Sequence, residues 1–266
     1  MAGLYFHIPF CASRCIYCGF YSTLTPRAEK ATTMDLYVDA LCKEVVMEKK
    51  YIFDDKSDAA DRLETIYFGG GTPSQLNAFH IEKIFSCIAE NYADRIANYD
   101  EMEITFECNP DDVTSEFAEN LKHLPINRIS MGAQTFSDER LKFLRRRHKA
   151  ADVKTAISRL RNAGIENISI DLMFGFPNES LDEWKLDIDK AIALDVEHLS
   201  AYSLMYEEGT PLYQLLLKGK AKDMDEELYR TMYDTLIDRL ALAKYEQYEI
   251  SNFAKLTYSA VSPFRS

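Results

Sequence analysis

Short apolar runs alternate with amphipathic segments along this chain. The runs are rich in β-branched and aromatic residues, and several end abruptly in Gly, Pro or Asn, which favours strands. The predicted strands are Leu4–Ile8, Thr65–Phe68, Glu103–Glu107, Arg128–Met131, Asn167–Leu172 and His198–Ser203. Between them, apolar residues recur at helical spacing. The predicted helices are Asp35–Lys50, Ile81–Tyr92, Ser115–His123, Ala151–Ala163, Leu181–Leu194 and Asp225–Ala243.

Six strands, each followed by a helix, predict a parallel α/β sheet with right-handed crossovers. The pattern alone leaves open the strand order, and it leaves open whether the sheet stays flat or curves into a partial barrel. In parallel architectures of either kind, the functional site lies at the carboxyl ends of the strands. Residues that follow these strands are therefore the first place to look for chemistry.

Charge and composition exclude several function classes. The 266 residues contain 31 Lys and Arg against 43 Asp and Glu, a formal net charge of −12. Such an excess argues against a nucleic-acid partner and against a broad anionic-membrane surface. The basic run Arg145–Lys149 stands out, either as a solvated helix end or as a contact for an anion. No apolar stretch is long enough to span a membrane and the first residues lack signal-peptide features, so a cytoplasmic protein is expected.

The strongest chemical signal is a group of three cysteines directly after the first predicted strand. Cys11, Cys15 and Cys18 lie within eight residues, and thiols so spaced can converge on a soft metal centre. An iron–sulfur cubane normally takes four thiolates, so three would leave one iron open to a small molecule. A structural zinc site, which needs a closed shell of four ligands, is the alternative. The remaining cysteines, of which Cys42 and Cys87 fall on apolar helix faces, are expected to be packing residues.

A second signal is the glycine-rich run Phe68–Ser74, at the end of the second predicted strand. Three consecutive glycines let the backbone approach a ligand closely. The run lacks the Gly-Lys-Ser/Thr ending of a P-loop and the spacing of a dinucleotide fingerprint.

Together these motifs resemble the radical S-adenosylmethionine (SAM) superfamily. The Cys-x3-Cys-x2-Cys loop with an aromatic before its last Cys is similar to that superfamily's cluster loop. The phrases Tyr5–Cys11 and Tyr67–Ser74 narrow the resemblance to the group of oxygen-independent coproporphyrinogen III oxidases and HemW-type heme chaperones. Further matching phrases follow in order, at Phe106–Pro110, Arg128–Phe136, Asp171–Pro177 and Tyr248–Ala254. The resemblance implies a partial (β/α)6 barrel with outer helices.

The resemblance also implies a site. Cys11, Cys15 and Cys18 would hold a [4Fe–4S] cluster, with SAM on its fourth iron. The implied SAM contacts are Tyr5, Tyr17, Gly71, Thr72, Glu107, Gln134, Arg146 and Asp171. Carboxylates and an amide can pair with the ammonium and hydroxyls of SAM, and a guanidinium can clamp its carboxylate. Arg146 has Arg145 and Arg147 as neighbours, so a slip of one residue would change this assignment.

Two departures bear on function within the group. The oxidases resemble Cys-x3-Cys-x2-Cys-x-Cys, whereas Phe20 stands at the last position here. That difference favours a HemW-like protein that binds heme, carries a SAM-bound cluster and transfers heme to a recipient hemoprotein, with an electron donor as a further partner. The alternative is a coproporphyrinogen III oxidase that decarboxylates propionates through a 5′-deoxyadenosyl radical. A zinc-binding structural module is the third.

The second departure is at the end of the chain, where residues 256–266 differ from the family's usual continuation. We therefore expect residues 1–245 to form the core barrel and residues 246–266 to begin a C-terminal region that is otherwise missing. The five histidines are scattered and do not identify a heme ligand.

Overall fold

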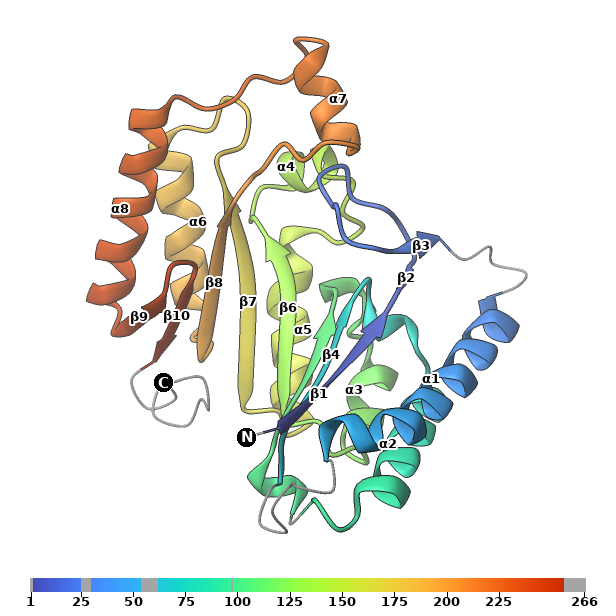
Figure 1. Cartoon of the computed structure of the whole chain (residues 1–266). Helices are drawn as coiled ribbons and strands as arrows, with labels where there is room; N and C mark the ends of the chain where they lie inside the picture. Colours follow the sequence, from blue (N-terminus) through green and yellow to red (C-terminus); the bar gives the residue numbers. More distant parts are fainter. Residues whose placement is uncertain (1, 25–29, 54–61, 97, 256–266) are drawn as a thin grey trace.

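The computed structural model describes residues 2–24, 30–53, 62–96 and 98–255. Its main feature is an eight-stranded sheet of order β1-β4-β5-β6-β7-β8-β10-β9 (Figure 1). The first six strands in this order run parallel to their neighbours. They are β1 (Ala2–Ile8), β4 (Leu63–Gly70), β5 (Glu103–Cys108), β6 (Arg128–Gln134), β7 (Asn167–Phe174) and β8 (His198–Ser203). All six predicted strands are confirmed, five of them one to three residues longer at one or both ends.

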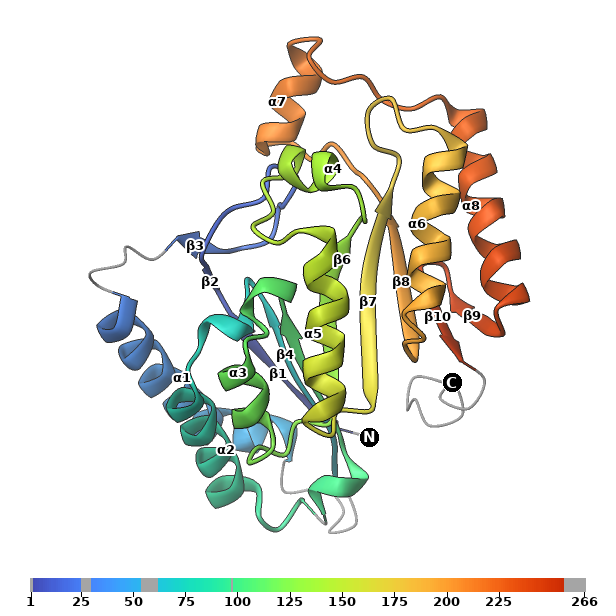
Figure 2. The ribbon, with the colours of Figure 1, turned by 180° about the vertical axis from the view of Figure 1, so that it is seen from behind.

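Helices cover the outer face of this sheet, as Figures 1 and 2 show. Six helices match the predicted ones to within about five residues at each end. They are α1 (Lys30–Ile52), α2 (Ala78–Tyr92), α3 (Ser115–Leu121), α5 (Ala150–Asn162), α6 (Leu181–Ala193) and α8 (Glu226–Leu242). Side-chain caps fix several starts: the Asn77 side chain accepts from the His80 N–H before α2, and Ser180 accepts from the Glu183 N–H before α6. Cys42 and Cys87 pack against the core between α1 and α2, as expected.

Several short elements were not predicted. They are β2 (Phe10–Cys11), β3 (Thr23–Leu24), α4 (Asp138–Phe143), α7 (Pro211–Leu217), and the 3-10 turns η1 (Pro73–Gln75), η2 (Tyr99–Glu101) and η3 (Pro110–Asp112). The antiparallel hairpin of β9 (Tyr245–Glu249) and β10 (Asn252–Lys255) was also missed, because β9 is mostly polar and exposed and β10 has only two buried residues, Phe253 and Ala254. The hairpin extends the main sheet through β10, which pairs with β8. The expected boundary after residue 245 stays a prediction, and residues 256–266 lie outside the described part of the chain.

The two faces of the parallel strands differ sharply in chemistry. On β6, Ile129, Met131 and Ala133 are fully buried against the helices, whereas Arg128 and Ser130 line the interior. The same alternation runs along β5 and β7. The inner face carries Glu103 and Glu107 on β5, and Asn167, Asp171 and Met173 on β7.

The edge strands β1 and β9 do not pair with one another, so the described sheet is a partial barrel with an open side. This confirms the expected architecture of parallel strands with outer helices. Within the described ranges, no helix is both long enough and apolar enough to cross a membrane.

Candidate functional site

The cysteine loop is fixed at the carboxyl end of the barrel by main-chain hydrogen bonds. Ile16, which is buried, donates from its N–H to the Leu144 carbonyl at 3.2 Å and accepts from the Leu212 N–H at 2.9 Å. These bonds tie the loop to the ends of α4 and α7. The Thr23 N–H donates to the Pro9 carbonyl at 2.7 Å, which closes the loop at its base.

The loop forms one wall of a cavity of about 170 Å³ at the strand ends. The structure brings most of the sequence-predicted residues together there. The cavity is lined by Cys11, Cys15, Cys18, Tyr17, Gly71, Thr72, Glu107, Gln134, Arg146 and Asp171. Tyr5 lines neither this cavity nor the larger one below it; its ring is 60% exposed and stacks on Tyr67, with the centroids 5.8 Å apart.

Two side chains point hydrogen-bond donors at the cysteine sulfurs. The Thr72 hydroxyl donates to Cys11 Sγ at 3.5 Å, and the Arg146 Nη1 donates to Cys15 Sγ at 3.6 Å. Both bonds stabilise thiolate charge. All three thiols are free, and no three His, Cys, Asp or Glu side chains in the described ranges gather closely enough for a single metal ion. A cubane holds each cysteine on a different iron, whereas a mononuclear zinc site holds all of its ligands on one ion.

Arg146 and its neighbours in the basic run have separate roles. The Arg146 Nη2 donates to Asn109 Oδ1 at 2.6 Å and to the Gly132 carbonyl at 2.7 Å, which fixes the guanidinium at the cavity wall. Arg147 instead pairs with Asp111 and Asp112, at 2.8 and 2.6 Å. Of the three arginines in the run, Arg146 is therefore the one held against a cysteine sulfur. Its assignment as a SAM contact stays a prediction.

Gln134 reaches the cavity because β6 ends in an unusual turn. Its φ of 66° is in the left-handed region, and the sheet register shifts between Gly132 and Gln134. A Cβ on Gly132 would lie 2.6 Å from the Gln134 Nε2 and 3.0 Å from the Arg146 Nη2. A side chain at position 132 would therefore have to displace the Gln134 amide or the Arg146 guanidinium from the cavity wall.

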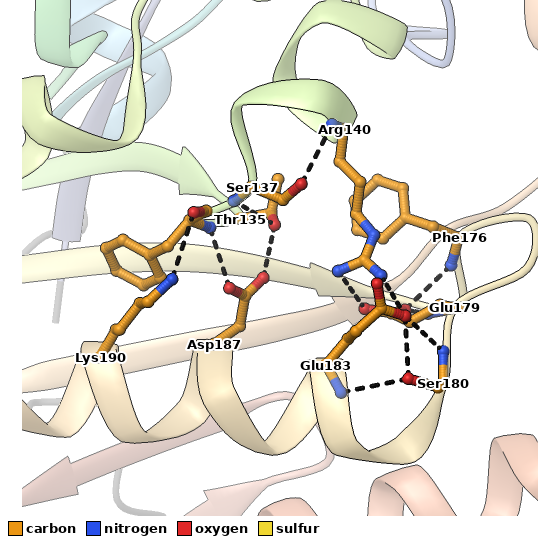
Figure 3. Close-up of polar contacts among 11 residues, drawn as sticks. Thr135, Ser137, Arg140, Phe176, Glu179, Ser180, Glu183, Asp187 and Lys190 are labelled. Atoms are coloured by element: carbon orange, nitrogen blue, oxygen red, sulfur yellow. Dashed lines mark hydrogen bonds and ion pairs between the residues drawn. The ribbon is translucent and has the colours of Figure 1, made fainter.

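A buried polar cluster behind the sheet holds this turn in place (Figure 3). Asp187 on α6 accepts hydrogen bonds from the Thr135 hydroxyl and from the Phe136 N–H. Arg140 on α4 pairs with Glu179 at 3.2 Å and Glu183 at 2.9 Å. The cluster therefore fastens the segments after β6 and β7 to α6, and so fixes the wall on which Gln134 lies.

Glu107 and Asp171 form the acidic part of the site. The Tyr67 hydroxyl donates to Glu107 Oε1 at 2.7 Å and orients this carboxylate. Burial raises the pKa of Glu107 above its usual value. Burial and the nearby Glu107 charge raise the pKa of Asp171 to about 7. A positive charge or further hydrogen-bond donors beside these two groups would therefore stabilise their charged forms.

Below the cysteine pocket, the barrel interior holds a larger cavity of about 760 Å³. Tyr17, Cys18, Glu107, Gln134 and Asp171 line both cavities. Phe20, Tyr202 and Met205 line the larger cavity and are partly exposed. Arg128, Asn167, His198 and Tyr248 line it at the amino ends of β6, β7 and β8 and at the hairpin. Sequence reasoning missed this lower set, although the alternation of polar residues along the strands was a signal that could have revealed it.

Comparison with known proteins identifies the family. A model of the radical SAM superfamily matches residues 5–191. The chain belongs to the radical SAM superfamily. Membership in the radical SAM superfamily implies SAM and a [4Fe–4S] cluster. The described residues fit such a group, because three free thiols and two sulfur-directed donors line one pocket.

Within the superfamily, the chain is similar to proteins of tetrapyrrole metabolism. It is 38% identical to the heme chaperone HemW of Bacillus subtilis, over 96% of this chain and 64% of that protein. It is 35% identical to HemW of Lactococcus lactis, over 94% and 61%. The Escherichia coli coproporphyrinogen III oxidase HemN shares the fold, with a TM-score of 0.80 at 24% identity, over 95% of this chain and 55% of that one. The chain thus spans less than two thirds of each of these proteins.

Proposed function

We propose that this chain is the radical SAM part of a HemW-like protein, which binds heme and passes it to a recipient hemoprotein. Phe20 is the observation that carries this choice over the oxidase. It stands where the resemblance places a further cysteine in the oxidases, and its ring is 69% exposed at the larger cavity. The similarity to the HemW chaperones of two bacteria over nearly all of this chain supports the same choice.

In this proposal, Cys11, Cys15 and Cys18 hold the cluster at the strand ends. When bound, the cluster and SAM supply one-electron reduction of the sulfonium and a carbon radical. The protein's own part is positional. The Arg146 guanidinium, fixed by Asn109 and Gly132, offers donors to a carboxylate beside the cysteines.

The acidic residues complete the SAM subsite. Glu107, held by the Tyr67 hydroxyl, and Asp171 present acceptors to an ammonium group or to ribose hydroxyls. Their burial favours a cationic ligand such as SAM, because the ligand's positive charge would offset the desolvation of the two carboxylates. Gly71 contributes differently: its N–H donates to the Ile8 carbonyl at 2.8 Å, and the loop can approach β1 because position 71 has no side chain.

In this proposal, heme binds in the larger cavity. A volume of about 760 Å³ is in the range of small-molecule and cofactor sites. Phe20, Met173, Tyr202 and Met205 supply apolar surface for a macrocycle near the cysteine end. The recipient hemoprotein and the electron donor are the partners that this function requires.

Anaerobic reconstitution tests the cofactor part of the proposal. The intact chain should give a brown protein whose visible spectrum changes on addition of SAM and, separately, of heme. Replacing Cys11, Cys15 or Cys18 by Ala should abolish the chromophore. Cys42→Ala and Cys87→Ala are matched controls that should keep the iron content. Equal loss of iron in a control would overturn the ligand set, and a colourless protein with one zinc per chain would favour the zinc module.

A second assay separates the chaperone from the oxidase. The reconstituted protein is incubated anaerobically with SAM, a reductant and coproporphyrinogen III, and the porphyrins are then separated by chromatography. We expect heme to bind and no coproporphyrinogen to be converted, because Phe20 offers neither a thiol nor a hydrogen bond near the cysteines. Product accumulating over many turnovers would replace the chaperone proposal with the oxidase.

A further inference from the structure

Arg128 is a cation inside the barrel that makes no direct ion pair with another described residue. It is the first residue of β6, and its side chain lines the larger cavity. Within the described ranges, its guanidinium makes one hydrogen bond, from Nη1 to the Thr105 hydroxyl at 3.2 Å, and no ion pair. The carboxylate of Glu103 lies on the neighbouring strand but bonds the same hydroxyl at 3.4 Å. Four of the five guanidinium N–H groups therefore remain for a ligand.

Neutral hydrogen-bonding side chains flank Arg128 on β7 and β8, and Glu103, Glu107 and Asp171 are the acids of the same cavity. The positive charge of Arg128 opposes the raised pKa of Glu107 and of Asp171. Asn167 is its register partner on β7. His198 on β8 is hydrogen-bonded through Nδ1 to the Ser169 hydroxyl at 2.7 Å and through Nε2 to the Tyr248 hydroxyl at 2.8 Å. Burial, together with the positive charge of Arg128, lowers the pKa of His198 to about 3. The imidazole is therefore uncharged at neutral pH, and Arg128 is the positive centre of this end of the cavity.

The position of Arg128 separates it from the cysteine pocket. The acids that line both cavities, Glu107 and Asp171, lie toward the carboxyl ends of β5 and β7. In the strand register Glu107 pairs with Ser130 and Asp171 with Gly132, so both acids lie between Arg128 and Gln134. Gln134 itself is roughly 20 Å of strand beyond Arg128. A ligand that reaches both ends must be long, and its lower end must satisfy a guanidinium.

We infer that Arg128 and the neutral donors around it form a carboxylate-binding subsite at the deep end of the cavity. A guanidinium fork matches a carboxylate through two parallel hydrogen bonds. This inference deepens the proposed function and rests on it in one respect: the carboxylate is then a propionate of the bound tetrapyrrole. The macrocycle lies between Arg128 and the apolar side chains near the cysteine loop.

Esterified ligands test the subsite without altering the protein. Binding of protoporphyrin IX and of its dimethyl ester to the full chain is measured by fluorescence titration. We expect the free acid to bind at least tenfold more tightly, the size typical of a charge-assisted hydrogen bond. Arg128→Gln should bring the ratio close to one, and Arg128→Lys should restore part of it. Arg239→Gln removes a cation on α8, paired with Asp189 outside the cavity, and should keep the full preference.

A small probe separates failure of the subsite from failure of the tetrapyrrole proposal. Saturation-transfer NMR with benzoate should give a signal that Arg128→Gln abolishes and Arg239→Gln retains, with benzyl alcohol giving none. Equal binding of acid and ester in the intact chain would overturn the subsite and leave tetrapyrrole binding standing. If neither porphyrin binds while the benzoate signal depends on Arg128, the subsite stands and the heme proposal falls. A benzoate signal unchanged by Arg128→Gln would overturn the subsite.

Discussion

The inner and outer faces of the same parallel strands are built on opposite principles. Outward residues such as Phe106 and Ile129 are fully buried against helices, where apolar area removed from water stabilises the fold. Inward residues such as Arg128 and Asp171 line a cavity and keep polar groups free for a ligand. Along these strands, every second residue packs against the helices and supports the fold, and the residue between faces the cavity and is available for chemistry. Substitutions on the two faces should therefore have effects that can be told apart.

Phe106→Ala should have the largest effect on stability. Its ring is fully buried on the outer face and contacts Phe68, with centroids 5.5 Å apart. Loss of an aromatic from such a core costs about 3–5 kcal/mol. Glu107→Gln, one residue later and on the inner face, keeps a group that can accept the Tyr67 hydrogen bond. Urea unfolding should show a large loss for the first variant and a small one for the second, while calorimetry shows weakened SAM binding for the second. Equal losses of stability would contradict the division of faces.

In the glycine-rich loop, Gly71 faces backbone atoms and Gly69 faces side chains of the site, so substitutions at the two positions should have different effects. A Cβ at Gly71 would lie 2.8 Å from the Ile8 carbonyl oxygen and 2.9 Å from the Pro9 carbonyl carbon, both backbone atoms. A Cβ at Gly69 would meet the side chains of Tyr5, Tyr67 and Glu107 instead. Gly71→Ala should therefore displace the segment that leads into Cys11, at a cost of about 1–3 kcal/mol.

Iron content and SAM titration distinguish the two glycine variants. Gly71→Ala should lose iron on reconstitution as well as SAM binding, because the cysteine loop itself moves. Gly69→Ala should keep its iron and lose affinity for SAM. A Gly71→Ala protein with full iron and unchanged SAM affinity would show that the loop tolerates a side chain there.

Arg146→Gln and Arg147→Gln separate two adjacent cations. Arg146 donates toward Cys15 and is fixed by Asn109, whereas Arg147 is held by Asp111 and Asp112. Removing a guanidinium that clamps a ligand carboxylate should weaken SAM binding by about ten- to a hundredfold. Arg147→Gln should change it by less than about threefold. The opposite order in calorimetric titrations would move the assignment by one residue.

Sequence reasoning succeeded where local pattern determines structure. The six parallel strands were predicted because their outward residues are apolar, and the cysteine loop because three thiols follow the first strand at short spacing. The other residues of the pocket were implied by the resemblance to the radical SAM superfamily. It failed at the β9–β10 hairpin, in which β9 is mostly polar and exposed and β10 is held by pairing with β8. It also missed Arg128. A cation at the start of a strand is usually solvent-exposed, and the sequence does not show that the curved sheet places this side chain in the cavity. Tyr5 stacks on Tyr67 and lines neither cavity, but its hydroxyl lies close to Gly69, beside Glu107, so its assignment as a SAM contact stays a prediction.

Asp171→Asn gives the smallest and most specific effect. Burial and the nearby Glu107 raise the pKa of Asp171 to about 7, against the opposing charges of Arg128 and Arg146. Because the folded state holds this proton more tightly than the unfolded chain, the stability that the protonated group contributes is lost as the pH rises from about 4 to about 7. Asparagine has no proton to lose. The free energy of unfolding of the variant should therefore rise relative to that of the parent between pH 5 and pH 8. The expected rise is about 1–2 kcal/mol once residual solvent contact is allowed for.

Thermal melts at pH 5, 6, 7 and 8 measure this gain, with Asp195→Asn as the control. Asp195 is exposed, and its hydrogen bond to Lys255 lowers its pKa, so its contribution is constant over this range and is lost only at more acidic pH. The difference in melting temperature between Asp195→Asn and the parent should thus stay constant with pH. The difference between Asp171→Asn and the parent should widen as the pH rises. If both differences stay constant, Asp171 is already ionised at pH 5. The inner face is then more fully solvated than the sharp contrast with the outer face implies.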